Sequence, residues 1–175
     1  MRERLKAIDW HVYGLSVEDL DHIMQITRDF AAHRRAYMDQ VEAQYRAESP
    51  DQADDILDGI LPYLTYELYY LWEACILRLM GIFEGVVERQ FLPPAQYHGY
   101  RSRIRALKGA GYEYSEKDVV EDWVKLRNAI AHSPPERFRP HMIEEADAQE
   151  CCNLLKCVLT DLLAQQTRMA ASDTE

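Results

Sequence analysis

Apolar residues recur along most of this chain at the three- and four-residue spacing of helices, and no run alternates convincingly with period two. A capping serine, Ser16, begins the first long pattern, which continues to about Ala47. A second start signal, Ser49 followed by proline, opens a longer pattern that runs to Phe91. Pro62 lies inside that pattern, where it should kink or split the helix. The predicted inner face of the first helix contains Leu20, Ile23, Thr27, Phe30, Tyr37, Val41 and Tyr45.

Three further helices are predicted after the stop signal Leu92-Pro93-Pro94. A short helix covers residues 95–108, the next covers residues 115–132 and is ended by Pro134, and the last covers about 151–167. The basic side chains predicted to stay in solvent on the short helix are Arg101, Arg103, Arg105 and Lys108. The predicted buried stripe of the next helix is Val119, Trp123, Leu126 and Ile130.

These elements predict an all-α fold, an antiparallel bundle of four principal helices plus short helices, because the connections between them are short. The 175 residues fit one domain, residues 1–168, followed by a polar tail, 169–175, that we expect to be disordered. Ala74, Gly81 and Gly85 share a stripe of the central helix, where each glycine costs up to about 1 kcal/mol relative to alanine. A close helix approach, within the bundle or across a dimer, would compensate for that cost.

Charge and cysteine usage narrow the function classes. The net charge of -10 argues against indiscriminate polyanion binding over the whole surface. The segment from Tyr97 to His141 is nevertheless about +3, which leaves about -13 for the rest of the chain. Charged residues interrupt the most apolar stretch, Leu68 to Val87, so no membrane span is predicted. The four cysteines lack paired C-x-x-C spacing, so we expect no metal and no other cofactor. No apolar signal-peptide pattern follows Met1-Arg2-Glu3-Arg4, so we expect reduced thiols in the cytoplasm.

Candidate chemistry gathers at the end of the 115–132 helix, where Arg127, Asn128 and His132 precede the proline stop. An imidazole exchanges protons near neutral pH, and a guanidinium binds phosphate oxygens and stabilises charge that develops on them. Together they suit metal-free RNA cleavage, in which an imidazole activates the ribose 2′-hydroxyl for attack on the adjacent phosphorus. In an ideal helix Arg127 and His132 point about 140° apart. A frayed last turn, the length of the arginine or a second subunit must therefore bring them together.

The same residues also have a purely structural interpretation. A histidine at a helix C-terminus interacts favourably with the helix dipole, and Arg127 can pair with an acid of its own helix. Arg101 and Arg105, with Arg139 in the following loop, are candidates for contacts with an RNA backbone. Solvated basic side chains on these segments are the simpler alternative.

Two segments resemble a known family. Leu126-Arg127-Asn128-Ala129-Ile130-Ala131-His132 resembles the signature of the HEPN superfamily, in which an arginine, a polar residue that is often asparagine and three more residues precede a helix-ending histidine. Tyr70-Leu71-Trp72-Glu73 resembles the aromatic-Glu segment that several HEPN groups carry on the facing helix. The resemblance covers these motifs and the helical layout, roughly residues 60 to 165.

This resemblance implies a homodimer in which two such motifs line one cleft and, in catalytic members, metal-independent cleavage of an RNA substrate. Such ribonucleases often act as toxins or in phage defence, sometimes beside a nucleotidyltransferase antitoxin. Carried over by position, Arg127 and His132 are catalytic, Asn128 supports the site, and Glu73 orients Arg127 or His132. Pro134 stands where one toxin group has a tyrosine, so modification of that tyrosine by a partner is not implied.

Two other functions stay open at this point. A non-catalytic HEPN-like module would bind a nucleotide, RNA or a partner protein through the same cleft, and the acidic net charge favours it. A helical bundle that uses its small-residue stripe only to dimerise is the third interpretation.

Overall fold

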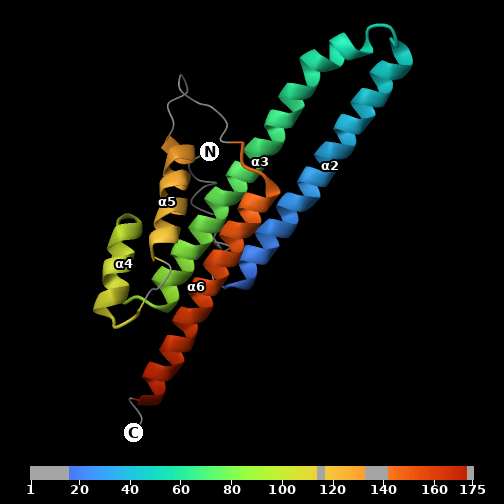
Figure 1. Ribbon diagram of the computed structural model, residues 1–175. Helices are drawn as coiled ribbons and strands as arrows, with labels where there is room; N and C mark the ends of the chain where they lie inside the picture. Colours follow the sequence, from blue (N-terminus) through green and yellow to red (C-terminus); the bar gives the residue numbers. More distant parts are fainter. Residues whose placement is uncertain (1–15, 114–116, 133–141, 173–175) are drawn as a thin grey trace, which may run out of the picture.

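The computed structural model describes residues 16–113, 117–132 and 142–172. Within these ranges the chain forms five α-helices and no strand, which confirms the predicted all-α class. The helices are α2 (Glu18–Glu48), α3 (Ala53–Gln90), α4 (Gly99–Gly109), α5 (Lys117–His132) and α6 (Glu145–Ser172). In Figure 1, α2 and α3 form a long antiparallel hairpin, α6 runs beside its lower half, and α4 and α5 flank α3 on the side away from α2.

The central element is α3, which contacts every other described helix. Its C-terminal half is apolar on most of its circumference, so it can be covered from several sides at once. The helix continues through Pro62 without a break, so the predicted split into two helices is wrong. The core side chains that are almost completely buried include Trp72, Ile76, Leu79, Met80, Phe83 and Val86 from α3, with Leu20 and Met24 from α2 and Leu155 and Leu159 from α6. Burying each of these large side chains contributes roughly 1.5–3 kcal/mol.

The inner face of α2 differs from the predicted stripe. Phe30 is 63% exposed and Tyr37 is 45% exposed. The buried residues of α2 are Leu20, Met24, Thr27 and Ala31. Beyond Ala31 no residue of this helix is fully buried, because from there α2 packs within a two-helix hairpin. A continuous apolar pattern therefore does not require a continuous core.

Small residues on α3 do not mark a close approach within the chain. Ala74 and Gly81 are exposed, and a Cβ atom built at Gly81 would meet no atom within 4 Å. The expectation of tight packing inside the bundle is therefore wrong at Gly81, and dimerisation through this stripe remains a prediction.

The last helix extends further toward the C-terminus than expected. α6 continues to Ser172, so residues 169–172 are helical rather than a disordered tail, and residues 173–175 lie outside the described part of the chain. None of the described helices combines the length and the apolar composition needed to cross a bilayer.

Candidate functional site

The register of α5 decides which of its side chains face the centre of the fold. Val120 is completely buried, whereas Val119 is 44% exposed, so the predicted stripe is wrong by one residue at this end. Trp123 and Val124 pack partly buried against the core. Positions 120, 123, 124 and 127 lie on one face of a helix at i, i+3, i+4 and i+7. Arg127 therefore occupies a position directed toward α3 and needs a polar partner there.

The partner of Arg127 on α3 is Glu84. The Nη2 atom of Arg127 donates to Oε1 of Glu84 at 3.1 Å, and Nη1 donates to Oδ1 of Asn128 at 2.9 Å. The Arg127 side chain is 28% exposed and that of Glu84 only 11%. Burial strengthens this charge-assisted contact relative to a surface ion pair. The structure thus brings Arg127 and Asn128 together and fixes the guanidinium against α3.

Glu84 also binds a second arginine. Nη1 of Arg103, on α4, lies 3.2 Å from Oε2 of Glu84, and Nη2 of Arg103 lies 2.8 Å from Oε2 of Glu88. The Arg103 side chain is only 14% exposed, so the prediction that it stays in solvent is wrong. We call Glu84, Glu88, Arg103 and Arg127 the ion-pair network; it joins α3, α4 and α5.

Glu73, predicted to orient Arg127 or His132, does not lie beside Arg127, and a role toward His132 stays a prediction. The carboxylate that orients Arg127 belongs to Glu84, which follows Glu73 by eleven residues on α3. This separation corresponds to roughly 16 Å along the helix axis. Glu73 is itself buried, with 4% of its surface exposed. Sequence reasoning missed Glu84, although the pair Glu84 and Glu88, four residues apart in an apolar helix, is a signal for a charged edge.

His132 is exposed as the last residue of α5. The helix keeps its α conformation to that residue, so no frayed turn rotates His132 toward Arg127. The two residues are separated by roughly 7.5 Å along the axis and by about 140° around it. Within the described part of one chain, Arg127 is held by Glu84 and Asn128 and is not brought together with His132.

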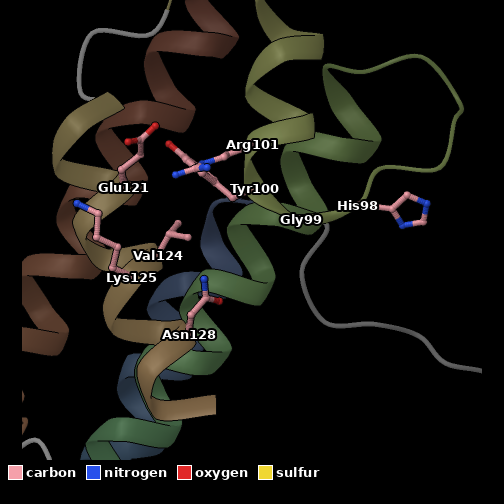
Figure 2. A pocket seen from close by; sticks show the side chains of 8 residues that line it. All are labelled: His98, Gly99, Tyr100, Arg101, Glu121, Val124, Lys125 and Asn128. Atoms are coloured by element: carbon pink, nitrogen blue, oxygen red, sulfur yellow. The ribbon is translucent and has the colours of Figure 1, made fainter. Parts of the chain in front are cut away.

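Arg101 and Arg105 are exposed on α4, as predicted for RNA-contacting candidates, and Arg139 lies outside the described residues. A cavity of about 310 Å³ lies between α4 and α5, and Arg101, Lys125 and Asn128 are among the residues that line it. In Figure 2, Arg101 and Glu121 extend toward one another, Asn128 lies one turn beyond Val124 on α5, and the His98 ring points away from them.

The acid seen to pair with Arg127 is Glu84 of α3, and Asp122 of its own helix has a different partner. Asp122 instead accepts a hydrogen bond from Nζ of Lys125 at 2.6 Å. This bond raises the pKa of Lys125, so the ammonium group stays charged at neutral pH. Both side chains are 73% exposed, and such a pair contributes little to stability.

The described ranges contain no group of three or more His, Cys, Asp or Glu side chains arranged to hold a metal ion. Searches against protein-family models, curated proteins and solved structures found no match to this chain. The local likeness to the HEPN signature around Arg127 and His132 is therefore the basis on which a family relationship is proposed.

Proposed function

We propose that this protein is a metal-independent endoribonuclease of HEPN type, active as a homodimer in the cytoplasm. The observation that carries the proposal is the arrangement on α5: Arg127 is fixed by Glu84 and Asn128, and His132 is exposed at the end of the same helix. Because the two side chains point about 140° apart on one helix, a second copy of α5 completes the site. By analogy with the family, a role in toxicity or phage defence and a nucleotidyltransferase antitoxin are part of the proposal.

The proposed reaction is attack of a ribose 2′-hydroxyl on its own phosphodiester. The imidazole of His132 removes the hydroxyl proton while the 2′-oxygen bonds to phosphorus, and the bond from phosphorus to the 5′-oxygen breaks. A proton donor from the second copy neutralises the leaving 5′-oxygen, which yields a cyclic phosphate and a 5′-hydroxyl end. Arg127 binds a non-bridging oxygen and stabilises its developing charge.

RNA cleavage in EDTA by the wild type, His132→Ala and Arg127→Ala tests this proposal. We expect His132→Ala to lose about 10²–10⁴-fold in rate, the usual contribution of general acid–base catalysis. His132 is the cleaner probe, because it is exposed and its removal leaves the ion-pair network intact. His33→Ala and Arg89→Ala are matched controls, since both residues are exposed and lie outside α5. Equal rates for the wild type and His132→Ala refute the assignment.

Mixing the two inactive chains tests the composite site. If Arg127 of one copy acts with His132 of the other, an equimolar mixture of Arg127→Ala and His132→Ala regains part of the activity that each chain alone lacks. A self-sufficient site within one chain gives no such recovery.

The second candidate function is a non-catalytic RNA-binding module of the same fold. Engagement of Arg127 by a buried carboxylate favours it, because a guanidinium already paired in this way has less charge to offer a phosphate. A wild-type chain that binds RNA but leaves it intact in the cleavage assay decides for this function.

A further inference from the structure

A continuous groove runs between α4 and α5. The cavity of about 310 Å³ beside Asn128 adjoins a second one of about 370 Å³, and Arg101 and Glu121 line both. The second cavity extends along α4 past Arg105 and Lys108. We call these two cavities together the α4–α5 groove. Figure 2 shows its first half, open between the two helices with Asn128 at one end.

The lining of this groove is basic although the chain carries a net charge of -10. Four exposed cationic side chains line it against one carboxylate, that of Glu121. The four are Arg101, Arg105, Lys108 and Lys125. This local excess of positive charge, lying in a concave surface, produces a positive electrostatic potential inside the groove.

The positions of these cations follow from how α4 packs. Tyr100, Ile104 and Leu107 are buried on its inner face. The positions one residue further, 101, 105 and 108, therefore share one outer edge at i, i+4 and i+7. They form a row along the groove, and Lys125 of α5 adds a fourth charge from the opposite wall.

Backbone groups add to the same field. α4 begins at Gly99, which lines the groove, and its first turn contains no acidic residue that would neutralise the partial positive charge of a helix N-terminus. Arg101 is also close enough to Lys125 to oppose its protonation, although the bond to Asp122 is the larger influence and raises the pKa of Lys125 overall.

We infer that the α4–α5 groove binds the phosphate backbone of single-stranded RNA and leads it to Asn128 and Arg127. A row of cations on one wall of the groove matches the row of phosphates along an RNA strand. The choice of RNA among linear polyanions rests on the proposed function. Glu121 also lines the groove and limits affinity, because its carboxylate repels the ligand.

Fluorescence anisotropy with a labelled single-stranded oligouridylate of about twelve nucleotides, within the usual range of single-strand site sizes, tests the inference. The full chain carries His132→Ala so that the probe stays intact. Arg101→Glu and Arg105→Glu are each compared with Arg168→Glu, the same charge change on exposed α6 surface outside the groove. Arg101→Gln keeps the test valid if the charge reversal disturbs folding.

We expect each groove reversal to weaken binding by about tenfold and each lost phosphate contact to reduce the salt-dependence slope by about 0.7. Glu121→Gln should tighten binding, which a merely structural role of this residue does not explain. Arg168→Glu should change affinity much less than either groove variant. Uridine monophosphate should compete poorly, because one phosphate engages only part of the cationic row.

The inference is overturned if the probe does not bind, if groove variants bind like the parent chain, or if an acidic peptide binds with equal strength. Its failure is distinguishable from failure of the proposed function. Groove-dependent binding by a wild type that never cleaves RNA keeps the inference and rejects the nuclease. If the wild type cleaves RNA but the groove variants bind it as tightly as the parent chain, the nuclease is kept and the inference about the groove is rejected.

Discussion

Glu84 is the residue whose removal tests the ion-pair network most directly. In Glu84→Gln the volume of the side chain and one acceptor oxygen are preserved, but the negative charge shared by Arg127 and Arg103 is lost. Removing one partner of a buried ion pair costs about 3–5 kcal/mol, because the remaining charge stays desolvated. Arg127 is 28% exposed and can recover some hydration, so we expect the lower end, about 3 kcal/mol.

Arg127→Met should cost less than Glu84→Gln. Glu84 then keeps Arg103 at 3.2 Å, so no buried charge is left alone. We expect a loss of about 1–2 kcal/mol, close to that of one charge-assisted hydrogen bond. This asymmetry follows from the structure, in which one carboxylate serves two guanidiniums.

Urea unfolding followed by tryptophan fluorescence measures both losses, and a double-mutant cycle isolates the pair. Glu84→Gln should also lower the melting temperature by roughly 6–12 °C, because 1 kcal/mol corresponds to roughly 2–4 °C in a chain of this size. The coupling energy between Glu84 and Arg127 should be about 1 kcal/mol or more. The matched control is Glu42 with Arg46, an exposed pair on α2 at 2.9 Å, where we expect no resolvable coupling. Equal coupling in both pairs, or equal cost of both single substitutions, refutes the argument from burial.

Two further predictions concern α5 and the cysteines. Val120→Ala should destabilise the protein by about 2 kcal/mol and Val119→Ala by less than about 0.5 kcal/mol, because only Val120 is buried. The same unfolding assay measures both losses, and equal losses would show that the register of α5 is wrong. Thiol titration with a disulfide reagent should label Cys157 in the folded chain, since burial raises the pKa of Cys151 strongly and that of Cys152 to about 11. Above the ordinary thiol pKa of 9.0 the unfolded chain loses protons that the folded Cys152 retains until about pH 11. Stability should therefore fall as the pH rises through this window, less steeply in Cys152→Ala.

The existence and order of the helices could be predicted because helical periodicity, caps and proline stops are local properties. The faces that become buried depend on neighbours that a local pattern does not specify. Tyr37 fits an apolar stripe, yet it is exposed because α2 lacks a third helix beside its second half. Phe30 is exposed although Thr27 and Ala31, on the neighbouring face of the same helix, are buried. Similarly, Val119 and Val120 are adjacent valines, and only the packing of α5 on α3 distinguishes them.

In the candidate site, too, contacts between sequence neighbours could be predicted and contacts between distant residues could not. Contact between Arg127 and Asn128 links neighbours in sequence and could be anticipated from the motif. Glu84 is 43 residues from Arg127, and its role depends on which turn of α3 lies opposite α5. Arg103 could not be separated from the other basic residues of α4 by charge alone. It is buried because it lies on the edge of α4 that meets Glu84 and Glu88.

The ion-pair network changes what Arg127 can contribute to phosphate binding. Two guanidiniums and two carboxylates balance each other in the network, so Arg127 adds little net positive charge at the end of the α4–α5 groove. Phosphate attraction then depends on the exposed cations of the groove, while the network keeps Arg127 in one orientation. Glu84→Gln separates these roles: it should lower stability and yet tighten binding of the oligouridylate, because it removes a negative charge next to Arg127. Weaker RNA binding by a folded Glu84→Gln chain would mean that orientation of Arg127 matters more than its charge.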